Sequence, residues 1–406
     1  MAEGGAGARA AAAPGAGPLA GVRVVELAGI GPGPFAAMTL ADLGADVVRV
    51  DRPGGHALSA APETELTNRN KRSVVLDLKS PEGVEAALTL VDRADVLIEG
   101  YRPGVAERLG VGPEACLARN SRLVYGRMTG WGQDGPLADR AGHDIGYIAV
   151  TGALGMTGPA DGRPVAPANL LGDYAGGSLY LVIGVLAALH HARAAGEGQV
   201  VDAAIVDGTS HLTTMIQGLL AAGVWQDGRE TNLLDGGCPF YGTYATSDGG
   251  FMAVGALEPK FYEEFIRLLG LPDEAPRRDD LAAWGALREA IAARFAARTR
   301  AEWTEVFEGS DACVAPVLSL TEAHTHPHLT ARGTFVEHEG LTQPAPAPRF
   351  SATPTAVTRP PALPGAHTAE VARDWNAPGL PGTSLPGTGL PGTSPSGTPE
   401  GDQSTP

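Results

Sequence analysis

Three side chains of this 406-residue chain could act as acid/base groups. His143 lies in a glycine-flanked segment, Asp173 stands where a long apolar run begins, and Glu258 separates a strand pattern from a helix pattern. Imidazole and carboxyl groups take up and release protons, and a second carboxyl can set the tautomer and charge of the imidazole. Each residue also has a structural explanation: a hydrogen-bonded loop histidine, a helix N-cap and an acid at a helix start. Sequence spacing leaves open whether the three meet in space.

Other reactive residue types lack the context that their chemistry needs. His324, His326 and His328 alternate as metal ligands could, but no carboxylate motif accompanies them and a proline interrupts them, which favours a solvated loop. Ser178 is not part of a nucleophile elbow, and the sequence has no Walker-type glycine loop. The three cysteines form no Cys-x-x-Cys pair, which excludes a disulfide scaffold and a cysteine zinc site and fits a reducing compartment. We expect no metal site.

A glycine-rich turn after the first strand pattern partly matches a dinucleotide-binding fingerprint. Residues 29–33 alternate glycine with other residues, and Asp51 follows about twenty residues later, where an acid would bind ribose. The position of the third glycine, which lets the helix pack closely on the sheet, is Pro34 instead, and Arg52 follows the acid. We interpret the segment as an ordinary βαβ turn.

The charge is distributed unevenly along the chain. The chain has 30 Lys/Arg and 46 Asp/Glu, a net charge of −16, which argues against a general nucleic-acid binder. Residues 1–130 carry 14 basic and 15 acidic side chains, whereas residues 131–406 carry 16 and 31. If an anionic small molecule binds this chain, the first third is therefore the place where the charge permits it.

The elements that must position these side chains begin as alternating strands and helices. A helix is expected over 35–43, and another begins at Ser80–Pro81, with serine as N-cap and proline in the first turn. This alternation predicts an α/β fold, a Rossmann-like large domain with a mostly parallel sheet covered on both faces. The expected strands are 22–27, 45–51, 73–78, 94–99 and 122–128.

The second half of the chain predicts a smaller α+β domain. Apolar helices are expected near 173–193 and 206–222. The apolar part of the first is shorter than the roughly 20 residues that a membrane span requires. A hairpin over 241–255 and amphipathic helices over 259–269 and 280–298 follow. We divide the chain into a flexible leader (1–17), a large domain (18–205, completed by about 330–373), a linker helix region (206–235), a small domain (236–329) and a disordered LPGT-rich tail (374–406).

Several long motifs resemble the α-methylacyl-CoA racemase family, part of the family III CoA-transferase superfamily. The resemblance covers about residues 18–360. The motifs are PLAGVRVVELAGIGPGPFAAMTLADLGADVVRVDRP, NRNKRSVVLDLKS, DVLIEGYRPGVAERLG, RMTGWGQDGPLADRAGHDIGY, GDYAGGS, GQVVDAAIVDG and DACVAPVL.

The resemblance implies an isomerase that inverts the α-carbon of 2-methylacyl-CoA thioesters by 1,1-proton transfer through an enolate. It implies that His143, supported by Glu258, and Asp173 are acid/base groups on opposite faces of the substrate. The backbone N–H of Asp144 is our candidate donor to the enolate oxygen. No metal, flavin or pyridoxal is implied, and CoA is part of the substrate rather than a cofactor. Family members are interlocked dimers with active sites at the junction of two chains, so we expect a homodimer.

The resemblance also implies a set of CoA-binding residues in the near-neutral first third and around His143. These are Arg52, Leu76, Lys79, Gly100, Tyr101, Arg102, Arg108, Gly142 and Tyr147. Arginine suits forked phosphate contacts and stacking on adenine. We expect no nucleic-acid or membrane partner and a cytoplasmic location, because the chain carries no peroxisomal address.

Two alternatives stay open. A CoA-transferase of the same superfamily would use Asp173 as a nucleophile, through acyl-anhydride and thioester intermediates. A non-catalytic CoA-binding protein would be favoured if the three candidates did not converge in space.

Overall fold

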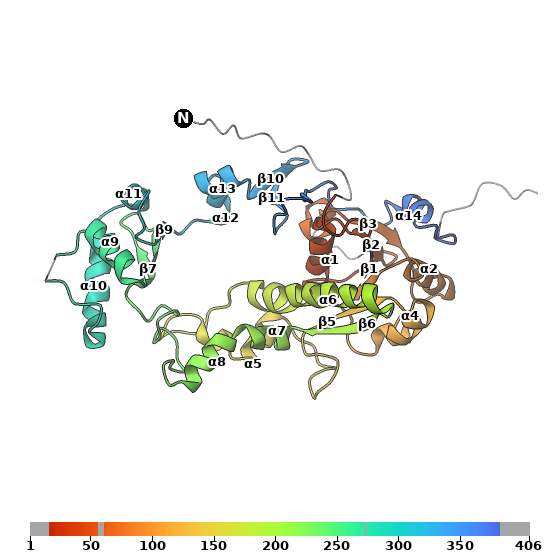
Figure 1. Ribbon diagram of the computed structural model, residues 1–406, viewed down its shortest axis with the longest axis horizontal. Coiled ribbons are helices and arrows are strands. Elements are labelled where there is room, and N and C mark those ends of the chain that lie inside the picture. Colours follow the sequence, from red (N-terminus) through yellow and green to blue (C-terminus); the bar gives the residue numbers. More distant parts are fainter. Residues whose placement is uncertain (1–15, 56–60, 273, 382–406) are drawn as a thin grey trace, which may run out of the picture.

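The computed structural model describes residues 16–55, 61–272 and 274–381, which form a large and a small lobe (Figure 1). A six-stranded parallel sheet lies in the large lobe, with the strand order β3-β2-β1-β4-β5-β6. This is the order of a doubly wound Rossmann sheet. The strands are added outward in one direction from β1 and in the other direction from β4, so the strand order reverses between these two strands. The strands are β1 Arg23–Leu27, β2 Asp46–Asp51, β3 Arg72–Val75, β4 Val96–Glu99, β5 Val124–Thr129 and β6 Gln199–Ala204. The predicted α/β fold with a parallel sheet is confirmed.

The edge strand β6 was not predicted. It pairs with β5 in parallel register, from Val124 opposite Gln199 to Thr129 opposite Ala204. Only its last two residues are buried, so the segment lacks the continuous apolar run that marks the central strands.

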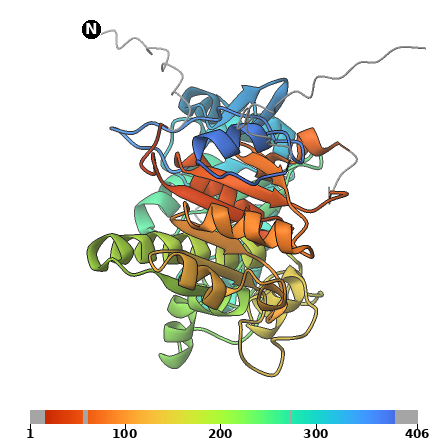
Figure 2. The ribbon, with the colours of Figure 1, turned by 90° about the vertical axis from the view of Figure 1, so that its right-hand side faces the viewer.

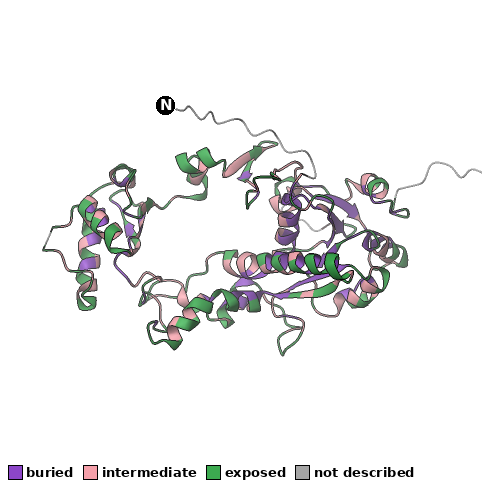
Figure 3. Ribbon diagram, in the orientation of Figure 1, coloured by how far each residue is buried: buried purple, intermediate pink, exposed green. Residues whose placement is uncertain are grey.

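Helices cover both faces of the sheet, and each face has its own apolar core. On one face α1 (Pro32–Asp42) and α6 (Leu179–Ala195) pack against the strands. On the other face the cover consists of α2 (Pro81–Val91), α4 (Pro113–Arg119) and α14 (Thr368–Asp374). The strands between the two layers are buried, whereas the outer sides of the helices are exposed (Figure 3).

Local sequence signals predicted the start of α2 correctly and placed the start of α1 three residues too late. The side chain of Ser80 accepts a hydrogen bond from the N–H of Gly83 (3.0 Å) and caps α2, as predicted. The first helix, α1, begins at Pro32 rather than at residue 35. A proline fits the first turn because its φ is fixed near the helical value and its missing N–H needs no partner there. The apparent glycine turn is therefore partly helical.

The small lobe contains an antiparallel sheet and three helices. The hairpin is confirmed as β7 (Tyr241–Ala245) and β8 (Phe251–Gly255), and the third strand is β9 (Val314–Pro316). The helices are α9 (Pro259–Leu269), α10 (Trp284–Phe295), preceded by the 3₁₀ turn η5 (Leu281–Ala283), and α11 (Arg300–Phe307). Phe265, Phe295 and Trp303 are buried in a core separate from the two cores of the large lobe.

The remaining segments connect the elements of the two lobes, and the last of them lead the chain from the small lobe back to the large lobe. The helix predicted over 206–222 is interrupted at Thr213, because Thr213 and Thr214 each donate a side-chain hydrogen bond to a preceding backbone carbonyl. The helices in these connecting segments are α3 (Val105–Arg108), α5 (Asp144–Val150), the π-helix η4 (Leu170–Ser178), α7 (Ile205–Leu212), α8 (Thr214–Ala221), α12 (Leu320–Ala323) and α13 (Pro327–Arg332). The remaining elements are the 3₁₀ turns η1 (Pro62–Thr64), η2 (Leu66–Asn68) and η3 (Leu154–Met156) and the antiparallel pair β10 (Phe335–His338) and β11 (Leu341–Pro344).

By length and composition, the continuous helical stretch Leu170–Ala195 could cross a membrane. Its α6 part packs on the sheet through Leu181, Val185 and Leu189, which are buried in the core of that face. This packing is typical of a core helix.

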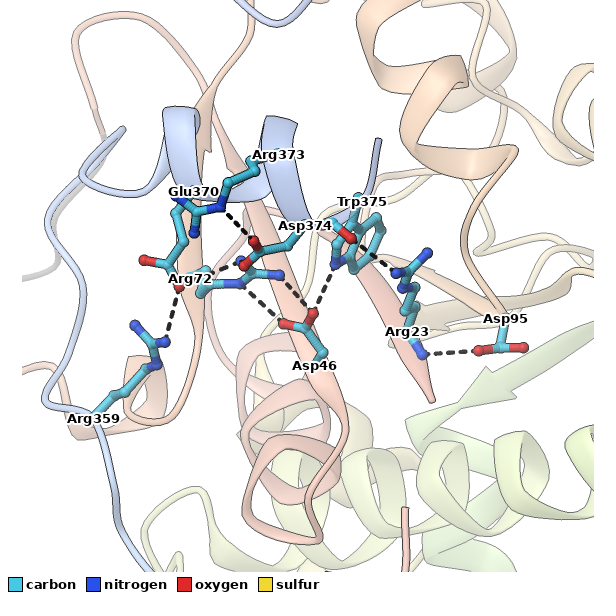
Figure 4. A network of polar contacts seen from close by, with 9 residues as sticks. All are labelled: Arg23, Asp46, Arg72, Asp95, Arg359, Glu370, Arg373, Asp374 and Trp375. Carbon is cyan, nitrogen blue, oxygen red and sulfur yellow. Dashed lines mark hydrogen bonds and ion pairs between the residues drawn. The ribbon is translucent and has the colours of Figure 1, made fainter. Parts of the chain in front are cut away.

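The ordered chain extends beyond the boundary at 374 that we expected for the tail. Trp375 and Leu380 are only 1% and 2% exposed and belong to the core beneath α14. The indole Nε1 of Trp375 donates to Asp46 Oδ2 (2.7 Å), and Arg72 bridges Asp46 and Asp374 (Figure 4). Figure 2 shows α14 in blue beside the red and orange strands. The repetitive composition of the tail gave no indication that Trp375 and Leu380 would be buried. The leader to residue 15 and the repeats after 381 lie outside the described residues.

Candidate active site

The loops after four neighbouring parallel strands surround a cavity of about 450 Å³. They follow β1, β4, β5 and β6, so the cavity lies at the carboxyl ends of the strands, where the strand order reverses. Ligands of doubly wound sheets bind at this position. His143 and Asp173 both line the cavity, although 29 intervening residues separate them in the sequence. The fold therefore brings together the two candidate acid/base groups.

His143 enters the cavity from the start of α5. Its backbone is extended and it occupies the N-cap position, so Asp144 is the first helical residue. The backbone N–H of Asp144 consequently lies at a helix N-terminus, as we expected for a donor to a developing oxyanion. The side chain of Asp144 is buried and has a separate role, because its Oδ1 accepts a hydrogen bond from the N–H of Asp173 (2.6 Å).

Asp173 lies inside the wide turn of the π-helix η4 rather than at a helix N-cap. Single π-helical turns are rare and occur frequently at functional sites. Asn169, four residues earlier, is the N-cap, and its Nδ2 donates to Asp173 Oδ2 (3.2 Å). Ser178 fixes the turn from the other end by donating to the carbonyl oxygens of Asp173 (2.9 Å) and Pro32 (2.7 Å).

The surroundings of Asp173 favour its protonated form. Burial raises the pKa of its carboxyl group, and the negative charge of Asp144 raises it further. The hydrogen bond from Asn169 and the proximity of His143 act in the opposite direction on this pKa. The carboxyl can thus hold a proton at a higher pH than an exposed aspartate, as a general acid requires.

Tyr147 forms part of the cavity wall behind His143. A Cβ atom at Gly142 would lie 2.5 Å from the tyrosine ring, so a glycine is required beside the histidine for the ring to fit. Trp131 packs edge-on against Tyr147, with ring centroids 4.7 Å apart. Burial, together with the charge of Asp173, raises the pKa of the Tyr147 phenol, whereas Arg102 lowers it.

Eight of the nine residues expected to bind CoA line one or both of two cavities that share Tyr101. Arg52, Leu76 and Lys79 line a second cavity of about 280 Å³, and Tyr101 lines both this cavity and the one with His143 and Asp173. The other expected residues at the first cavity are Gly100, Arg102, Gly142 and Tyr147. Arg108 lines neither cavity; it lies in α3 beside Gly104, the residue after the lining residue Pro103.

The carboxylate of Asp51, which also lines the second cavity, is already bound by neighbouring side chains. It is buried, is paired with Arg49 (2.9 Å) and accepts a hydrogen bond from the hydroxyl of Ser73 (2.5 Å). This arrangement agrees with interpreting the glycine-rich segment as an ordinary turn.

Glu258 does not line the cavity that contains His143 and Asp173. It is the residue before α9 in the small lobe, and its side chain makes no capping hydrogen bond there. Burial raises the pKa of the Cys313 thiol, and the negative charge of Glu258 raises it further. Within one chain the fold therefore places His143 and Asp173 at one cavity and leaves Glu258 in the small lobe.

The structure also shows residues and groupings that the sequence analysis did not assign. Asn169 donates a hydrogen bond to the carboxylate of Asp173 and could have been found only from its spacing of four residues before Asp173. In the described ranges, no three His, Cys, Asp or Glu side chains cluster as a metal site would require. His324 instead packs edge-on against Phe335 at 4.6 Å between ring centroids.

Comparison with known proteins places this chain among CoA enzymes. The profile of CoA-transferase family III matches residues 19–368. Human alpha-methylacyl-CoA racemase is 45% identical over 361 residues, covering 88% of this chain and 93% of that protein. Mouse succinyl-CoA:glutarate CoA-transferase is 31% identical, covering 88% and 86%. A CAIB/BAIF family protein from Brucella suis has a similar structure, with a TM-score of 0.77, 29% identity and coverage of 89% of this chain and 100% of that one. The chain belongs to CoA-transferase family III.

Proposed function

We propose that this protein racemises the α-carbon of 2-methylacyl-CoA thioesters by transferring a proton from one face to the other. The observation that carries the proposal is that His143 and Asp173 line one cavity from different elements, next to the cavity lined by Arg52 and Lys79. The 45% identity to human alpha-methylacyl-CoA racemase supports the same reaction.

The reaction needs one group that accepts a proton and one that donates it. The α-carbon C–H bond breaks, its proton passes to the basic group, and the electron pair moves onto the thioester oxygen to form an enolate. The protonated group on the opposite face then forms a new C–H bond and the carbonyl returns. The raised pKa of Asp173 suits the donor role, and the N–H of Asp144 would stabilise the enolate oxygen. CoA supplies the activating thioester, so the scheme uses no further cofactor.

The proposed support of His143 by Glu258 requires a second copy of the chain. Because Glu258 lies in the small lobe away from the cavity, the partner subunit's Glu258 would have to complete the pair. Ile145, two residues after His143, and Leu170, in the π-helix of Asp173, expose large apolar side chains, which supports a homodimer with shared active sites. A cytoplasmic location and the division into domains remain predictions.

The alternative is a family III CoA-transferase in which Asp173 attacks the thioester. Both reactions need the ionised form of Asp173 at one step, as a nucleophile or as the base for one enantiomer, so its pKa does not distinguish them. Transferase relatives at 31% identity are more distant than the racemase at 45%.

One assay separates these functions. An enantiopure 2-methylacyl-CoA is incubated with the protein in heavy water, with and without a free carboxylic acid as acceptor. We expect inversion accompanied by deuterium at the α-carbon, independent of the acid. Acyl-CoA formation from the free acid without α-deuterium would establish the transferase instead.

A further inference from the structure

A compact segment, residues 226–237, joins the two lobes and is held together by its own polar contacts. We name it the brace. Asn232, which is buried, exchanges hydrogen bonds with the backbone of Gln226: its Oδ1 accepts from the N–H (2.7 Å) and its Nδ2 donates to the carbonyl (3.0 Å). Asp235 accepts from the N–H groups of Asn232 (2.9 Å) and Gly237 (3.0 Å). These bonds close the segment on itself, so it can transmit position rather than act as a loose linker.

Each end of the brace is fixed to a different lobe. The guanidinium of Arg288, on α10 of the small lobe, donates to the carbonyls of Gly236 (2.7 Å) and Gly237 (2.9 Å). Trp225 and Cys238, which flank the brace, are both buried. The opposite side of the brace binds the large lobe.

Arg229 binds the loop that leads to the catalytic aspartate. Its guanidinium donates to the carbonyls of Gly162 (2.6 Å), Pro159 (3.1 Å) and Gly155 (3.4 Å). The neighbouring Glu230 accepts from the N–H of Ala160 (3.0 Å). One side chain thus gathers three backbone groups of the loop 155–165 and ties them to the brace.

This loop connects the two elements that carry the acid/base groups. It follows α5 (Asp144–Val150) by way of the 3₁₀ turn η3 and ends four residues before Asn169, the N-cap of the π-helix that holds Asp173. On the α5 side the chain is anchored by the buried residues Ile148 and Ala153. On the other side Val165 and Leu170 are 51% and 60% exposed. The contacts of Arg229 therefore matter more for Asp173 than for His143.

We infer that Arg229 is a positioning residue for Asp173, through the loop 155–165 and the Asn169 contact. The inference rests on the proposed function, in which Asp173 exchanges a proton with one face of the substrate. Loosening the loop should impair proton transfer at that face while leaving the face served by His143 largely intact. A general loss of structure would impair both faces.

The test measures α-proton exchange for each enantiomer separately in heavy water, using the full-length protein. Asp173→Asn first identifies the enantiomer that depends on Asp173, because its exchange is lost. Arg229→Gln should then lower exchange of that enantiomer, and racemisation with it, by about ten- to hundredfold, the range expected when a reacting group is displaced. Exchange of the other enantiomer should stay near the wild-type rate. Arg229→Lys should fall between, because an ammonium group cannot bind three carbonyls in a forked arrangement.

The matched control is Arg193→Gln, which removes an exposed arginine from the last turn of α6 and should leave both exchange rates unchanged. An equal loss for both enantiomers, or no loss, in Arg229→Gln would overturn the inference. Absence of exchange in the wild type would refute the proposed function itself. In that case amide hydrogen exchange decides: Arg229→Gln should increase exchange over residues 155–169, and an unchanged rate there would refute the role of Arg229.

Discussion

Replacing Gly208 by alanine should separate α7 from the helix that holds Asp173. A Cβ atom at Gly208 would lie 1.8 Å from the carbonyl oxygen of Gly176 and 2.9 Å from the ring of Tyr180. The first distance is about 1.6 Å short of ordinary contact, so the helices must move apart, and overpacking of this kind costs about 1–3 kcal/mol of unfolding free energy. Gly176 is three residues after Asp173, and a displacement near 1 Å at a reacting group can reduce the rate by about a hundredfold.

Urea denaturation and racemisation rates test this prediction together. Gly218→Ala is the matched control, because a Cβ atom there meets no described atom within 4 Å and lies in the helix α8. It should leave turnover unchanged and stabilise the protein by about 0.5–1 kcal/mol, since alanine favours a helix over glycine. If Gly208→Ala kept the stability and turnover of the wild type, the close packing of α7 against the π-helix would not position Asp173.

Three further changes have defined outcomes. Asn169→Ala removes a hydrogen bond that lowers the pKa of Asp173, so for the enantiomer whose α-proton Asp173 accepts, the acidic limb of the kcat/KM profile should move to higher pH; a shift of that limb to lower pH would contradict this. Trp375→Ala should lower the unfolding free energy in urea by about 3–5 kcal/mol, because a fully buried indole is lost; an effect below 1 kcal/mol would refute the anchor. Burial lowers the pKa of His367, whose neutral Nδ1 accepts from the N–H of Ser73 (3.3 Å). Stability should therefore fall as the pH drops below about 6.5, and His367→Gln should flatten that dependence in melting curves.

Features encoded by short-range signals could be predicted from the sequence. The Ser80–Pro81 helix start depends on a side chain that caps its own helix, and the observed α2 begins there. The Asp-Gly-Gly segment between alternating runs predicted the hairpin β7–β8. Helix α9, over residues 259–269, has the predicted bounds.

Features decided by tertiary contacts could not be predicted in this way. The π-helical turn at Asp173 depends on the side chains of Asp144 and Ser178, which are distant in sequence or buried. The anchoring of Trp375 depends on Asp46, 329 residues away. The assignment of His143 and Asp173 to one cavity came from the family resemblance, because spacing alone does not reveal the convergence of loops at a sheet edge.

The most direct test of the central claim compares His143→Ala with Asp173→Asn, each given the two enantiomers of a 2-methylacyl-CoA in heavy water. Because the two groups are proposed to act on opposite faces, neither variant should racemise, yet each should still exchange the α-proton of one enantiomer, and the enantiomers should differ between the variants. If both variants retained exchange of the same enantiomer, or if either racemised at the wild-type rate, His143 and Asp173 would not be opposed acid/base groups.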